Sequence, residues 1–205
     1  MELVLVGALF VVNLLISWWN ARAVGKAWVE LKAAGGGRRF MAWMGALMSG
    51  AGFTWCYLLV IGVVLWKTGV LNEDYLRLFF EVGYVLIIPV VLFAGWAITI
   101  DSWRQAYHQR TLGNMSVAGW NTFATGYNTY NAVSGLGDVL GDIFKTLSKT
   151  RDGNVMMLLI ALIAAGFALG LGAITTTLLI KHYAGQESLD SVAARAGHDV
   201  VDYVR

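Results

Sequence analysis

Residues 155–180 form an uninterrupted apolar stretch that limits what the whole chain can fold into. The stretch carries no charged residue, and it is bounded by Arg151 and Asp152 on one side and by Lys181 and His182 on the other. About 20 apolar residues cross the hydrocarbon core of a bilayer, whereas a wholly apolar run of about 10 to 14 is more typical of a buried helix in a soluble protein. The stretch therefore predicts a transmembrane helix.

The composition of the chain agrees with a membrane protein and limits its partners. Hydrophobic residues make up 58% of the 205 residues and charged residues 14%, which excludes an ordinary soluble domain. The net charge of +2 comes without a basic block, so we expect contact with the lipid bilayer and no nucleic-acid partner. Cys56 is the single cysteine, so the sequence predicts no internal disulfide, no metal site and no cofactor.

Three further apolar segments predict helices of the same kind, at residues 3–19, 40–66 and 78–100. The glycines of the AAGGG run at 33–37 end the helix before them. Pro89 predicts a kink within the third span, and Asn13 predicts a hydrogen bond between helices. The fold class is thus all-α, as a single membrane domain (residues 1–205) with four transmembrane helices.

The connector at residues 101–154 predicts an amphipathic helix that begins near Ser116 and bends at the glycines between 135 and 141. Its apolar residues recur at gaps of three and four, which is the helical period. One face carries the interfacial aromatics Trp120, Phe123, Tyr127 and Tyr130, and the other carries the polar residues Asn121, Thr125, Asn128 and Asn131. Either this helix lies on the inner leaflet with its aromatics in the headgroups, or its polar face meets other copies or lines a wet vestibule.

The tail at residues 186–205 predicts a short amphipathic helix of its own. Apolar residues share one face at helical spacing, and Ser188 is a suitable N-cap. A helix of this length is only marginally stable alone, so we expect it to dock on a partner.

Small residues at helical spacing predict close helix packing in two places. These candidate packing or oligomer-interface residues are Gly45, Ser49 and Gly52 in one span and Gly166, Gly170 and Gly172 in another. Small residues four apart let two backbones approach closely in lipid. The partner is either another helix of the same chain or a second subunit.

Glu81, near the start of the third span, has two possible roles. A carboxylate there is stabilised by the helix dipole and by interfacial water, and it is also a candidate pore mouth. No predicted span contains a histidine, and His108, His182 and His198 are too scattered to propose a metal site. The sequence therefore favours a protein that is not an enzyme.

The distribution of basic residues predicts the orientation. If the connectors after the first and third spans are cytoplasmic, they carry ten of the 15 basic residues, as the positive-inside rule requires. Four spans then place both termini on the non-cytoplasmic side. The compact chain without sorting signals indicates a bacterial inner membrane.

Two functional hypotheses follow from these patterns. The first is a non-enzymatic homo-oligomer that forms a pore or channel, or the membrane-embedded structural part of a secretion, conjugation or phage-related machine. Other membrane subunits are candidate partners of such an assembly. The second is a small membrane transporter or an accessory subunit of a transport complex.

Overall fold

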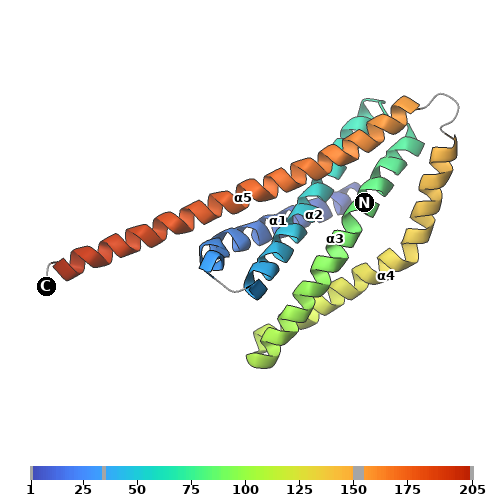
Figure 1. Ribbon diagram of the computed structural model, residues 1–205. Coiled ribbons are helices and arrows are strands. Elements are labelled where there is room, and N and C mark those ends of the chain that lie inside the picture. The colour runs from blue at the N-terminus through green and yellow to red at the C-terminus, as the bar shows by residue number, and fades with distance from the viewer. Residues whose placement is uncertain (1, 34–35, 150–154, 204–205) are drawn as a thin grey trace.

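The computed structural model is all helical, as predicted, and describes residues 2–33, 36–149 and 155–203. The described residues form five helices: α1 (Glu2–Ala33), α2 (Gly36–Lys67), α3 (Glu73–His108), α4 (Leu112–Lys149) and α5 (Val155–Tyr203). Figure 1 shows them as an elongated bundle from which the end of α5 projects.

α2 runs antiparallel to α1 and to α3. Asn13 and Val24 of α1 meet Gly52 and Gly45 of α2, and Phe80 and Gly83 of α3 meet Gly62 and Leu58 of α2. α5 also runs antiparallel to α2, because Gly172 meets Thr54 and Thr176 meets Ser49. The beginning of α1 and the end of α5 therefore lie at opposite ends of the bundle (Figure 1).

Within the described part of the chain, three helices are long and apolar enough to cross a bilayer: α2, α3 and the part of α5 over Val155–Gln186. They contain three of the four predicted spans. The predicted span at 3–19 forms the first half of α1, which is not among those three helices, so the count of four spans is not confirmed.

The predicted connector is divided between two helices. Its first residues extend α3 to His108, and the remainder forms α4, which runs back along α3. Residues 150–154 lie outside the described part of the chain. The helix stays continuous through the glycines at 135–141, and Figure 1 shows it as a bent helix.

The predicted tail is not a separate helix in the backbone. Residues 155–203 form one helix, α5, and no proline stands between 180 and 203 to end it. Its side chains from residue 187 onward lie outside the described part, as does everything after residue 203.

The connection between α2 and α3 shows why these elements begin and end where they do. Gly69 has φ of +67°, a conformation that glycine adopts readily, and the chain reverses there. Asn72 then caps α3, because its side-chain oxygen accepts a hydrogen bond from the Tyr75 backbone N–H at 3.1 Å. Glu73 and Asp74 in the first turn complement the helix dipole.

Candidate functional site: packed seams and an open glycine face

A cluster of short polar side chains joins α1, α2 and α5. The Asn13 side-chain amide donates to the Gly52 carbonyl at 2.9 Å, which confirms the predicted bond between helices. Ser17 donates back to the Asn13 carbonyl at 2.7 Å, and Ser49 donates to the Ser17 carbonyl at 2.7 Å. The Thr176 hydroxyl lies 3.5 Å from that of Ser49. The three helices are thus held by hydrogen bonds that lipid cannot replace.

Glycines let the backbones of this cluster approach closely. A Cβ at Gly172 would lie 2.7 Å from the Thr54 nitrogen and 2.8 Å from the Gly50 carbonyl oxygen. A Cβ at Gly52 would overlap the Ser17 hydroxyl, and one at Gly45 would lie 2.9 Å from a Val24 methyl. Three of the predicted packing glycines, together with Ser49, therefore contact helices of the same chain.

The other two predicted packing glycines, Gly166 and Gly170, have open space around them. No atom lies within 4 Å of a Cβ built at either position, other than those of the helix's own turns. Beside them on α5, Ile163, Phe167 and Ile174 are 56–69% exposed. The outer face of α5 (Ile163, Gly166, Phe167, Gly170 and Ile174) is therefore a small-residue face without a partner among the described residues.

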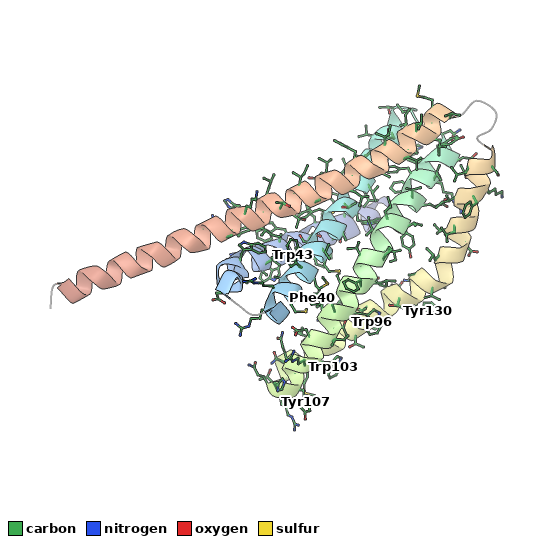
Figure 2. The ribbon with its side chains drawn as sticks, in the orientation of Figure 1. Phe40, Trp43, Trp96, Trp103, Tyr107 and Tyr130 are labelled. Carbon is green, nitrogen blue, oxygen red and sulfur yellow. The ribbon has the colours of Figure 1, made fainter. Side chains whose placement is uncertain are left out.

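A second seam joins α3 and α4 through threonines. Thr125 is buried, and its hydroxyl lies 3.1 Å from that of Thr99. Trp96 donates its indole N–H to Thr129 at 3.1 Å, and Trp103 donates to Thr122 at 2.8 Å (Figure 2). Thr125 of the predicted polar face thus packs on α3 of the same chain, a role that neither sequence-based alternative included.

The residues of this seam carry a signal in the sequence. Along α4, the positions that face α3 are small and are separated by four, three, four and three residues: Ala118, Thr122, Thr125, Thr129 and Ala132. This alternation is the spacing of a helix pair that stays in contact over several turns. Grouping the residues of α4 by polarity, rather than by small side-chain size, does not identify this seam.

The remaining predicted residues of α4 lie beside the seam or away from it. Asn121 and Asn128 are half-buried at its edges, and Asn131 is exposed. The four predicted interfacial aromatics point outward, with 60–71% of each side chain exposed, and neighbouring rings among Trp120, Phe123 and Tyr127 lie 6.0 and 6.4 Å apart. These four residues form an outer aromatic stripe that faces away from the bundle.

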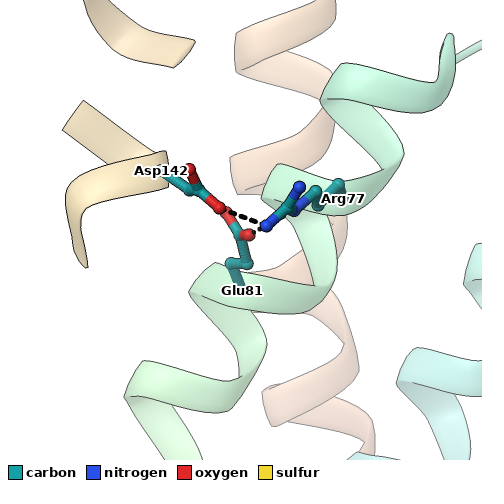
Figure 3. A network of polar contacts seen from close by, with 3 residues as sticks. All are labelled: Arg77, Glu81 and Asp142. Atoms are coloured by element: carbon teal, nitrogen blue, oxygen red, sulfur yellow. Dashed lines mark hydrogen bonds and ion pairs between the residues drawn. The ribbon is translucent and has the colours of Figure 1, made fainter. Parts of the chain in front are cut away.

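Glu81, the candidate pore-mouth residue, belongs to an ion network within the chain. Arg77, one turn earlier on α3, donates its Nε–H to the Glu81 carboxylate at 2.8 Å and pairs through Nη2 with Asp142 of α4 (Figure 3). The Glu81 side chain is only 11% exposed, while that of Arg77 is 68% exposed. The network joins the beginning of α3 to the second half of α4.

Within the described residues, no group of three His, Cys, Asp or Glu side chains is placed to hold a metal ion. Comparison with known proteins finds no matching family model, no similar curated protein and no similar solved structure. The outer face of α5 is then the best candidate for a functional surface. It carries glycines at helical spacing, like those that let helices pack closely within the bundle, but on the outside of the bundle.

Proposed function

We propose that this chain is a non-enzymatic integral membrane protein that assembles into an oligomer through the outer face of α5. It would serve as the membrane-embedded structural part of a larger assembly, or would form a pore with its own copies. The observation that carries the proposal is the open space around Gly166 and Gly170, which lie one helical turn apart.

The physical reason is the weakness of the hydrophobic effect between helices in lipid. Association there depends on close packing, and small residues four apart allow it. The chain already uses this device at Gly172, where the backbones of α2 and α5 meet. At the outer face, a helix of another chain could approach the α5 backbone equally closely.

A pore would have to form between copies. Two seams are filled: between α2 and α3, Gly62 is covered by the Phe80 ring and Gly83 by the Leu58 side chain, and Ala161, Ala165 and Ala168 of α5 are fully buried. The threonines of α4 are bonded to α3. A conducting path would therefore use surfaces that face outward in the single chain.

The arrangement of helices suggests a revised orientation. We place the α1–α2 and α3–α4 connections and the C-terminal part of α5 in the cytoplasm, and the beginning of α1 outside. Seven described basic side chains then gather at the cytoplasmic end and three at the other, as the positive-inside rule favours. The seven are Arg22, Lys26, Arg38, Arg39, Arg104, Arg110 and Lys181, and the three are Lys67, Arg77 and Lys145. The C-terminal end thus lies on the opposite side from the one that a four-span topology predicts.

The mass of the purified particle tests the proposal. We expect light scattering of the wild-type protein in nanodiscs to give several chains per particle, and Gly170→Leu to reduce that number. Gly119→Leu is the control, because Gly119 also has open space around it but lies on α4. A single chain per wild-type particle, or an equal loss in the control, would contradict the proposal. A monomer that binds another membrane protein through α5 would instead favour the accessory-subunit hypothesis.

A further inference from the structure

We propose that a groove between α2 and α5 binds one anionic phospholipid, with an acyl chain along the groove and the phosphate at Lys181. The groove has a volume of about 720 Å³ and is separate from the outer face of α5. Beyond the assembly role proposed above, this would make the protein a lipid-binding one.

The walls of the groove are apolar over most of their length. The α2 wall runs from Trp43 to Thr54, and the α5 wall runs back from Lys181 past Ala173. The inner end is formed by Leu86 and Val90 of α3. Thr54 already donates its hydroxyl to the Gly50 carbonyl at 2.8 Å, so its polar group is satisfied and its methyl group is left for an apolar ligand.

The length of the groove matches one leaflet of a bilayer. Eleven residues separate the two ends of the α2 wall, which at 1.5 Å per residue corresponds to about 16 Å. The hydrocarbon core of a bilayer is about 30 Å thick, so one leaflet contributes about 15 Å. A single acyl chain in its normal orientation would therefore lie along this wall from the interface to the midplane.

One end of the groove has the chemistry of a headgroup site. Trp28 and Trp43 meet edge to face there, with ring centroids 6.3 Å apart, next to Lys181 (Figure 2 labels Trp43). Tryptophans are enriched at the membrane interface, where their rings lie at headgroup level. Among the described residues, the Lys181 ammonium has no ion pair. This end also carries most of the basic side chains, which favours an anionic headgroup over a zwitterionic one.

The test is native mass spectrometry of the full chain after delipidation and addition of phosphatidylglycerol or phosphatidylcholine. We expect one phosphatidylglycerol to stay bound per chain and phosphatidylcholine to be lost. Lys181→Gln should weaken retention of phosphatidylglycerol about fivefold, since a basic residue near an anionic lipid surface contributes about 1 kcal/mol. Lys67→Gln is the matched control, because Lys67 also lies beside a tryptophan, with its Nζ 4.6 Å from the Trp66 ring centroid, but at the other end of α2.

A second pair of variants tests the acyl-chain site independently of charge. Ala173→Phe should fill the groove and abolish retention, whereas Val60→Phe, at an exposed position of α2 outside the groove, should leave it unchanged. Equal retention of the two lipids, or equal effects of the two lysine variants, would overturn the proposal. So would a change in particle mass with Ala173→Phe while phosphatidylglycerol stays bound, because a second copy would then occupy the groove. Elution volume and helical circular dichroism verify that each variant is folded.

Discussion

The two faces of α5 are built from similar small residues and yet differ completely in their surroundings. On the inner face, Ala161, Ala165 and Ala168 are fully buried and Gly172 touches the backbone of α2. On the outer face, a Cβ at Gly166 or Gly170 would have open space around it in the described part of the chain. A step of one residue turns a helix by about 100°, so adjacent positions can serve opposite purposes. The comparison teaches that register, not composition, separates residues that hold the fold from residues that face outward.

The same contrast holds on α4. Thr125 faces α3 and is buried, while Tyr127, two residues later, is 60% exposed. Substitutions on the inner faces should therefore cost stability, and matched substitutions on the outer faces should not.

The largest effect is expected at Gly172. In Gly172→Leu, the new side chain would have to occupy the space of the Thr54 and Gly50 backbones, and backbone cannot give way as a flexible side chain can. We expect a loss of about 3 kcal/mol or more in the free energy of unfolding, measured by denaturant titration in detergent. Gly170→Leu should not destabilise the monomer, because leucine is the better helix former and meets no neighbour. Equal losses in the two variants would remove the distinction between the faces.

The next effect concerns the seam between α3 and α4. The Thr125 hydroxyl lies 3.1 Å from where a Cβ at Gly95 would stand, so the larger side chain of Thr125→Leu should force the two helices apart. We expect the free energy of unfolding to fall by about 1–3 kcal/mol. Tyr127→Leu should have little effect on the pairing. Hydrogen–deuterium exchange would show the difference as faster exchange along α4 in the threonine variant alone. Unchanged exchange in both variants would mean that α4 does not depend on this seam.

A smaller effect is expected from removing one hydroxyl of the three-helix cluster. Thr176→Val keeps the shape of the side chain but loses the contact with Ser49. Hydrogen bonds between helices in a membrane contribute about 0.6 kcal/mol on average, and we expect a loss of that size by the same denaturant titration. Thr177→Val is the control, because Thr177 bonds only to the Ala173 carbonyl of its own helix. A loss as large as that of Gly172→Leu would show that hydrogen bonding, rather than close approach, holds this crossing.

The smallest effect is expected from the ion pair between Arg77 and Asp142. Because Arg77 is largely exposed, Asp142→Asn should lower the melting temperature only slightly. Salt screens exposed charges, so the difference from wild type should shrink further at about 1 M salt. Glu81→Gln should lower the melting temperature more at either ionic strength. Glu81 is nearly buried, and its carboxylate accepts a hydrogen bond from the same guanidinium. A large, salt-independent effect of Asp142→Asn would show that the pair is more shielded than its exposure indicates.

The sequence predicted well those features that depend on local pattern. Helical class and the apolar stretches within α2, α3 and α5 follow from hydrophobicity. Of the glycines expected to end a helix, Gly36 and Gly37 instead begin α2, and residue 35 lies outside the described part. Asn13 was also correctly expected to bond across helices, because an amide in an apolar span needs a partner.

Features that depend on which helices meet could not be predicted in this way. The asparagines and Thr125 of α4 suggested a wet or self-associating face, but Thr125 is buried with its hydroxyl against that of Thr99 on α3. Gly166 and Gly172 were grouped as one packing surface, although Gly172 meets α2 and Gly166 has open space around it among the described residues. Spacing shows which residues share a side of a helix, but the direction of that side is set by the packing of the whole bundle.

Cysteine cross-linking in native membranes tests most directly whether the outer face of α5 meets another chain. Cys56 is the single cysteine, so Cys56→Ala gives a background in which Phe167→Cys reports on that face. Phe93→Cys on α3 is the control, because Phe167 and Phe93 are both 60% exposed. With a membrane-permeant oxidant, we predict a disulfide-linked dimer for Phe167→Cys and none for Phe93→Cys. No dimer at Phe167, or the same yield at both positions, would contradict assembly through this face.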